Sequence, residues 1–198
     1  GFCLFGNAAI AARHALERPG LARVAVVDFD VHHGNGTQDI LWDEPRAMFV
    51  SSHQMPLYPG TGSPSERGGS NNVLNLPLAP ADGSEAFRAA WRDHGLPRLA
   101  AFRPDLVLIS AGFDAHERDP LGQLRLQDDD YHWITMQIRD IAERKAALAE
   151  ALDWPRDAMA SACRCVISGP CSCCIPSMLI RNCSMSRYAF AVSGKSPG

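Results

Sequence analysis

The sequence contains no apolar run that approaches the roughly 20 residues needed to span a bilayer. Its first residues lack the basic segment with which a secretory signal peptide begins. The formal net charge is only −3, which gives no electrostatic reason to bind nucleic acid or an anionic membrane. These absences predict a cytoplasmic protein without a membrane or direct nucleic-acid partner.

Cysteines are scarce before residue 163, and acidic residues are absent after Asp157. This change in composition predicts two parts, residues 1–150 as a piece of a globular domain and residues 151–198 as an atypical tail rich in Cys and Ser. The tail holds Cys163, Cys165, Cys171, Cys173, Cys174 and Cys183.

Apolar runs that predict strands alternate with segments that predict helices. Strands are expected at 24–30, 47–51, 73–78 and 106–110, and helices at 7–17, at 84–102 and from 128 onward. A loop of low apolar content is expected at 58–69. The alternation is typical of an α/β fold with an open, mainly parallel sheet flanked by helices, in which ligands bind beyond the carboxyl ends of the strands.

Two of the predicted helices begin at residues that commonly cap a helix, Ser84 and Asp128. Helical spacing places their expected buried faces at Phe87, Trp91 and Leu99 for the first, and at Ile134, Ile138 and Ile141 for the second.

Acidic and imidazole side chains follow two of the predicted strands. Alternate side chains of an extended segment share a face, so Asp28, Asp30 and His32 are expected to point together. Asp114 follows the strand at 106–110, and the ends of neighbouring parallel strands meet at one edge of a sheet. Burying such groups is costly unless a cation pairs with them. We therefore predict a metal site made by Asp30, His32 and Asp114.

The composition of this ligand set indicates a catalytic role. Two carboxylates and one imidazole leave the fourth position of a zinc ion open, as in catalytic zinc sites. A metal held there would polarise an amide carbonyl and activate water. The alternative is that these acids are helix caps or surface ion pairs, which the combined pattern disfavours.

Four segments together resemble blocks of the histone deacetylase and acetylpolyamine amidohydrolase superfamily. The segment Asp-Phe-Asp-Val-His-His-Gly-Asn-Gly-Thr-Gln at 28–38 resembles its metal-binding motif, and segments 1–5, 58–62 and 111–122 are similar to three further blocks in the same order. The resemblance covers residues 1–145, and its details are closest to class II and bacterial members. It implies an arginase-type α/β fold and a zinc-dependent amidohydrolase that deacetylates acetyl-lysine in a peptide or a small acetylated amine. An arginase-type ureohydrolase, which needs a second metal ion, is the alternative enzyme.

The resemblance also implies roles for individual residues. Asp30, His32 and Asp114 correspond to the zinc ligands, and Asp28 and Ser51 to ligands of a structural potassium ion, with the backbone oxygens of Asp30 and His32. Asp28 would also orient a catalytic histidine.

The remaining positions concern the catalytic histidines and the substrate. Asn35 corresponds to the partner of a second catalytic histidine, while Phe2, Tyr58 and Leu121 correspond to the walls of the acyl-lysine tunnel. Leu121 argues mildly against a polyamine-selective enzyme, because an acidic residue there would favour a cationic substrate.

Two catalytic motifs of the family, a His-His pair and a Gly-Gly-Tyr segment, match nothing in this sequence. The resemblance therefore implies a truncated catalytic domain, the central piece of a deacetylase. The non-enzymatic alternative is an inactive fragment or pseudoenzyme that binds zinc at most.

The other histidines are expected to have lesser roles. His33 should pack behind the metal site. His53 and His116 should either lie near the active-site mouth or be satisfied by local contacts. Three histidines in predicted helices are expected on the surface: His14, His94 and His132.

Three interpretations of the tail stay open. Cys171 and Cys174 have the C-x-x-C spacing of a metal module, although no second such pair follows. A disulfide-bonded extension would conflict with the intracellular character of the rest. Translation in a shifted frame is favoured, because acids, helical pattern and family motif are lost together, and it predicts a Gly-Gly-Tyr segment in another frame of the DNA.

Overall fold

The computed structural model describes residues 4–151 and 188–192. Its sheet has the strand order β3-β2-β1-β4-β5. The first four strands run parallel, and β5 pairs antiparallel with β4. The strands are β1 (Val24–Asp28), β2 (Ala47–Gln54), β3 (Val73–Leu78), β4 (Leu106–Ala111) and β5 (Tyr188–Val192). The predicted α/β fold with a mainly parallel sheet is confirmed.

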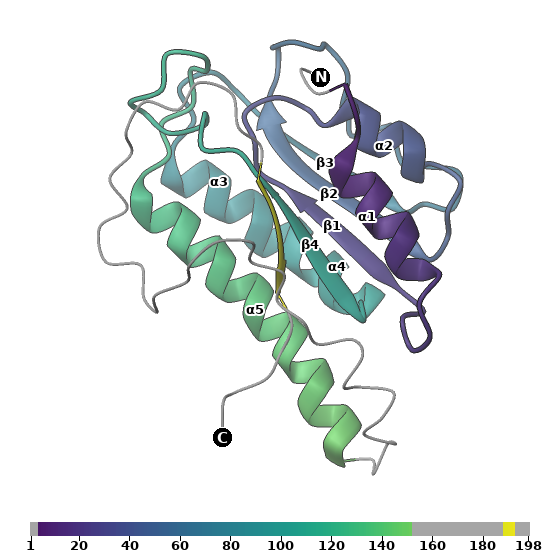
Figure 1. The fold of residues 1–198 in the computed structure, drawn as a ribbon. Helices are drawn as coiled ribbons and strands as arrows, with labels where there is room; N and C mark the ends of the chain where they lie inside the picture. Colours follow the sequence, from purple (N-terminus) through teal and green to yellow (C-terminus); the bar gives the residue numbers. More distant parts are fainter. Residues whose placement is uncertain (1–3, 152–187, 193–198) are drawn as a thin grey trace.

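Helices cover both faces of the sheet (Figure 1). Helices α1 and α2 pack on one face, against a core that includes Val24 and Val26. The run from α3 to α4 packs on the other face together with α5, against Ala25 and Val27. The helices are α1 (Asn7–Leu16), α2 (Asn35–Leu41), α3 (Ser84–Ala90), the π-helical turn η1 (Trp91–Gly95), α4 (Leu96–Phe102) and α5 (Asp128–Ala151). Because β1 is central and covered on both faces, all five of its residues are buried.

The predicted buried faces of the long helices are confirmed, whereas the predicted caps are wrong. Phe87, Trp91 and Leu99 are fully buried, as are Ile134 and Ile138, while Ile141 is partly buried. The N-cap of α3 is Gly83 rather than Ser84. Asp128 is itself the first residue of α5 and so lies inside the helix rather than at its N-cap.

A single buried carboxylate explains both of these differences. Asp130 accepts a hydrogen bond from the Gln127 backbone N–H at 2.8 Å, and another from the Ser84 hydroxyl at 2.6 Å. Asp130 therefore provides a hydrogen-bond acceptor for the backbone at the amino end of α5. It also joins α5 to α3, and this tertiary contact cannot be read from either helix alone.

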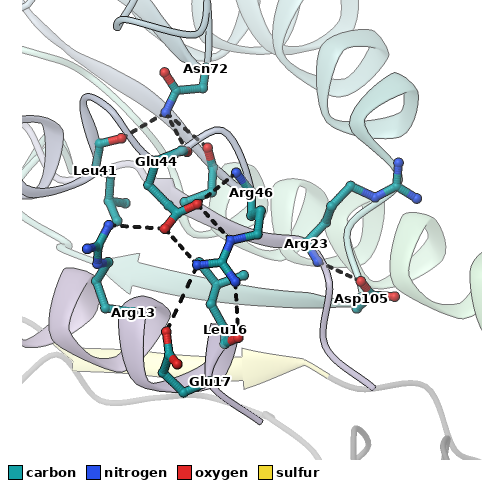
Figure 2. A network of polar contacts seen from close by, with 10 residues as sticks. Arg13, Leu16, Glu17, Arg23, Leu41, Glu44, Arg46, Asn72 and Asp105 are labelled. Carbon is teal, nitrogen blue, oxygen red and sulfur yellow. Dashed lines mark hydrogen bonds and ion pairs between the residues drawn. The ribbon is translucent and has the colours of Figure 1, made fainter. Parts of the chain in front are cut away.

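A second polar cluster holds the amino-terminal ends of β1 and β2 (Figure 2). The buried Glu44 carboxylate accepts hydrogen bonds from Arg13 at 3.1 Å and from Arg46 at 2.9 Å. Hydrogen bonds from Arg46 hold the pKa of Glu44 below its usual range. The Asn72 amide donates to the backbone oxygens of Leu41, Glu44 and Ala47. This cluster lies at the end of the sheet opposite the predicted ligand edge.

Two elements were not predicted from the sequence, α2 and β5. In addition, β1 ends at Asp28 rather than at residue 30, and β2 continues to Gln54. Apart from Ala151 and β5, the tail lies outside the described residues, as do its six cysteines, so the three interpretations of the tail stay predictions. No helix in the described part of the chain is long and apolar enough to cross a bilayer.

Candidate metal centre

Asp30, His32 and Asp114 meet at the carboxyl end of the sheet. Strands β1 and β4 are neighbours and run parallel, so the loops that follow them lie side by side. One ligand atom from each of the three residues lies within 4.8 Å of the other two. Their side chains are 5%, 7% and 17% exposed for Asp30, His32 and Asp114. Two carboxylates and an imidazole in so confined a space form a group that could hold a metal ion.

The two ligands after β1 converge for a reason that differs from the predicted one. The strand ends at Asp28, so Asp30 and His32 lie in a loop rather than on one face of an extended strand. The Asp30 N–H donates to Asp28 Oδ1 at 3.1 Å, and the His32 N–H donates to Asp30 Oδ1 at 2.8 Å. These turns, in which a carboxylate accepts from the backbone two residues on, fix the loop backbone and orient the Asp30 carboxylate. The His32 ring is oriented by its Nδ1, which lies 3.2 Å from Asp30 and 3.0 Å from Asp114.

Asp114 connects the β4 loop to the β1 loop. Its Oδ1 accepts the Val31 N–H at 2.9 Å, and its Oδ2 lies 3.0 Å from His32 Nδ1. Hydrogen bonds with Asp114 and Asp30 raise the pKa of His32 to about 9. Because a metal ligand must be deprotonated, metal binding at this group has to displace that proton and strengthens as the pH rises.

Two glycines leave the space that the carboxylates occupy. A Cβ added at Gly112 would lie 2.4 Å from Asp30 Oδ2, and one added at Gly34 would lie 2.7 Å from Asp28 Oδ2. Sequence reasoning missed both positions, although each glycine stands inside a motif that carries ligands. Glycine at these two positions therefore allows the backbone to lie against the carboxylates of Asp30 and Asp28.

Asp28 and Ser51 form a second group of oxygen atoms beside the first. They are directly paired in the β1–β2 register, and both are fully buried. Ser110 of β4 is opposite Asp28 on its other side. Carboxylate and hydroxyl oxygens are the donors that suit a hard cation rather than a soft metal.

Behind these groups, two buried histidines make hydrogen bonds with the loop between β2 and β3. His33 Nδ1 lies 2.7 Å from Thr61 Oγ1, and His33 Nε2 lies 3.1 Å from Gln38 Oε1. His53 Nδ1 lies 3.0 Å from Ser51 Oγ, and its Nε2 lies 3.1 Å from the Gly62 oxygen. His33 thus packs behind the site as predicted, and His53 is satisfied by local contacts.

The other histidines lie away from the ligand atoms. His116 is 3% exposed, accepts the Arg118 N–H at Nδ1 and lies 3.3 Å from Asp128, so local contacts satisfy it as well. The predicted surface positions of His14, His94 and His132 are confirmed.

The burial of His53 predicts a loss of stability in acid. Burial, followed by the nearby His33 ring, lowers the pKa of His53 to about 4. The unfolded chain, with a pKa near 6.5, therefore binds a proton between about pH 6.5 and pH 4 that the folded chain does not. We expect the free energy of unfolding to fall by roughly 3 kcal/mol across that window because of this group. Urea unfolding at a series of pH values should show a shallower decline for His53→Gln than for wild type, and parallel curves would contradict the assignment.

The described substrate residues of the prediction lie in loops, and the predicted partner of a catalytic histidine lies at a helix start. The Tyr58 and Leu121 side chains are 54% and 48% exposed. Asn35 is the first residue of α2 and is partly exposed. Phe2 lies outside the described residues, so its place in a tunnel stays a prediction.

The model of the histone deacetylase domain matches residues 1–151 of this chain. Histone deacetylase 10, chloroplastic, of Oryza sativa subsp. japonica is 45% identical over 145 residues, which is 72% of this chain and 33% of that protein. The histone deacetylase-like amidohydrolase of Pseudomonas aeruginosa is 43% identical over 150 residues, which is 74% of this chain and 40% of that protein.

Solved structures share this fold. The HDA15 HD domain matches with a TM-score of 0.68 and 39% identity, over 71% of this chain and 42% of that one. The acetylpolyamine aminohydrolase of Burkholderia pseudomallei matches with a TM-score of 0.66 and 37% identity, over 70% and 42% of the two chains. The chain thus spans less than half of the length of each of these relatives.

Proposed function

Because this chain belongs to the histone deacetylase family, we propose that the protein that carries it is a zinc-dependent amidohydrolase acting on N-acetylated lysine or a related acetylated amine. The observation that supports the proposal most is the buried group of Asp30, His32 and Asp114 at the carboxyl edge of the sheet. Family membership supports the deacetylase class, and the choice of zinc and of acetyl-lysine is our proposal. The cytoplasmic location expected from the sequence stays a prediction.

The ligand set fits a zinc ion with one position open for the substrate. Imidazole nitrogen and carboxylate oxygens are common zinc ligands, and three protein ligands are typical of catalytic sites. When bound, zinc would supply Lewis-acid polarisation of the scissile carbonyl. Among the residues that the structure describes, these three form one such group, which disfavours the paired-metal site of a ureohydrolase.

The chain itself holds the ligands in place. The Val31 and His32 N–H groups each occupy one carboxylate oxygen, that of Asp114 and that of Asp30 respectively. The second oxygen of each carboxylate is thereby oriented, and a preorganised ligand set binds its metal without a further ordering cost. Asp28 and Ser51, with the backbone oxygens of Asp30 and His32, would hold potassium directly behind the zinc site.

Tyr58 and Leu121, with Phe2, would line the tunnel for the acyl-lysine stem. An exposed aromatic ring and an exposed aliphatic side chain lose contact with water when a methylene chain lies between them, which favours an extended aliphatic substrate. Asn35 would orient a catalytic histidine. The resemblance assigns the general base and the oxyanion donor to motifs that match nothing in this sequence, so we expect little turnover from these 198 residues alone.

A substitution at Tyr58 tests the substrate assignment. In the protein that carries this chain, Tyr58→Ala should raise KM for an acetyl-lysine peptide roughly ten-fold, because the ring contact with the stem is lost. Acetate release should be measured beside Ile40→Ala, which truncates a side chain that is 44% exposed on α2. An unchanged KM for Tyr58→Ala would remove this residue from the tunnel.

A further inference from the structure

The loop that carries Tyr58 is joined to the segment of the metal ligands by a partly buried chain of polar side chains. We infer that Glu66 and Gln38 are positioning residues, which fix the Thr61–Gly62 turn, and with it the Tyr58 wall, relative to the metal ligands. This inference rests on the proposed function.

Glu66 accepts hydrogen bonds from the backbone of its own loop. Its Oε1 accepts the Ser63 N–H at 2.9 Å and the Gly62 N–H at 3.1 Å, and its Oε2 accepts the Gln38 amide at 2.6 Å. Burial raises the pKa of this carboxyl, but hydrogen bonds from Gln38, Ser63 and Gly62 lower it by more, so the net pKa falls. The carboxylate is therefore an anionic acceptor that organises three donors.

Gln38 connects Glu66 to His33, the residue that follows the predicted ligand His32. A carboxylate can only accept, so the Gln38 amide nitrogen donates to Glu66, and its carbonyl oxygen is left to accept from Asn75 and from His33 Nε2. His33 Nδ1 then accepts the Thr61 hydroxyl proton. One directed chain of hydrogen bonds thus leaves the loop at Thr61 and returns to it at Glu66.

The Thr61–Gly62 turn packs against His33 and His53 so closely that no side chain fits at Gly62. Gly62 has a φ of +95°, and a Cβ there would lie 2.4 Å from His53 Nε2 and 2.7 Å from His33 Cγ. The two rings are themselves in contact, with centroids 4.7 Å apart. His33 directly follows the predicted ligand His32, so the turn is built on the same segment as the metal site.

Tyr58 depends on this anchor. It lies four residues before Gly62 in the loop between β2 and β3, and 54% of its side chain is exposed. Packing therefore fixes the ring only in part, and the backbone of the loop has to supply the rest of its position. A loosened turn should weaken substrate binding without changing the metal ligands.

The test is Glu66→Gln in the whole protein that carries this chain, because glutamine keeps the shape but removes the charge and places a donor against donors. Hydrogen exchange at the Gly62 and Ser63 amides should become about ten-fold faster or more, since a glutamine has one acceptor oxygen and cannot accept at once from these amides and from the Gln38 amide. Calorimetry with an acetyl-lysine peptide should show affinity lower by about ten-fold, with zinc stoichiometry unchanged.

Glu44→Gln is the matched control. Glu44 is likewise a glutamate held by hydrogen bonds (Figure 2), but it is buried and lies three residues before β2, at the amino end of the sheet. The Glu44→Gln substitution should lower the melting temperature, while hydrogen exchange at the Gly62 amide and the affinity for the peptide stay as in wild type.

The same peptide affinity for both variants, or a loss of zinc in Glu66→Gln, would overturn the positioning role. If Glu66→Gln does not fold, Gln38→Met decides by the same measurements, because it breaks the chain in the middle. A wild-type protein that does not bind the peptide would refute the proposed function, and amide exchange would then decide alone whether Glu66 holds the turn.

Discussion

Asp114→Ala is expected to abolish zinc binding by a chain that still folds. The substitution removes one of three ligands and also the acceptor of the Val31 N–H, which holds the β4 loop to the β1 loop. Ligand loss at such a site should weaken zinc affinity by at least about 100-fold, since even changes behind the ligands cost 10- to 100-fold. Zinc content after dialysis, with circular dichroism to verify folding, measures the effect.

His116→Ala is the control for this substitution. His116 lies two residues further along, is more buried than Asp114 and contacts Arg118 and Asp128 rather than the ligands. Its zinc stoichiometry should equal that of wild type. An equal loss of zinc from both variants would contradict the assignment of Asp114 as a metal ligand.

Gly112→Ala is expected to damage the metal site almost as severely, although it changes no ligand. The new methyl group would lie 2.4 Å from Asp30 Oδ2 and 2.7 Å from Asp30 Cβ, so the first atoms of the side chain have to move. A displaced Asp30 withdraws one ligand, and we expect zinc affinity to fall by about two orders of magnitude. Competition with a chromogenic zinc chelator gives the affinity.

Gly36→Ala is the matched control on α2. A Cβ at Gly36 meets nothing within 4 Å, and alanine stabilises a helix by about 0.5–1 kcal/mol relative to glycine. This variant should bind zinc as wild type does and unfold at a slightly higher temperature. If Gly112→Ala also binds zinc normally, the close packing of the backbone on Asp30 has no role in the site.

The strands and the ligand group could be predicted because their signals are local. Each parallel strand is a short apolar run, and Asp30, His32 and Asp114 follow two of these runs directly. Because the carboxyl ends of parallel strands meet at one edge of a sheet, the three residues could be expected to lie together. The way in which Asp30 and His32 converge was predicted wrongly, because hydrogen bonds within the loop, not the pleat of a strand, direct them.

The features that sequence reasoning missed depend on contacts between distant residues. The capping of α5 by Asp130 involves Ser84, which lies 46 residues earlier. The chain that holds the Tyr58 loop joins Gln38 to Glu66 and His33 to Thr61, each pair 28 residues apart. No periodicity or spacing within one element carries such information. Glycines beside the carboxylates are visible in the motifs, but their need for space appears only with the backbone in place.

We propose that the protein carrying this chain is a zinc-dependent deacetylase. This proposal is tested most directly by measuring acetate release from an acetyl-lysine peptide and the zinc content of the same sample, before and after treatment with a chelator and after zinc is returned. We predict one zinc ion per chain, a loss of turnover in proportion to the zinc removed, and recovery of both when zinc is restored. Acetate release that continues after the zinc has been removed would contradict the account.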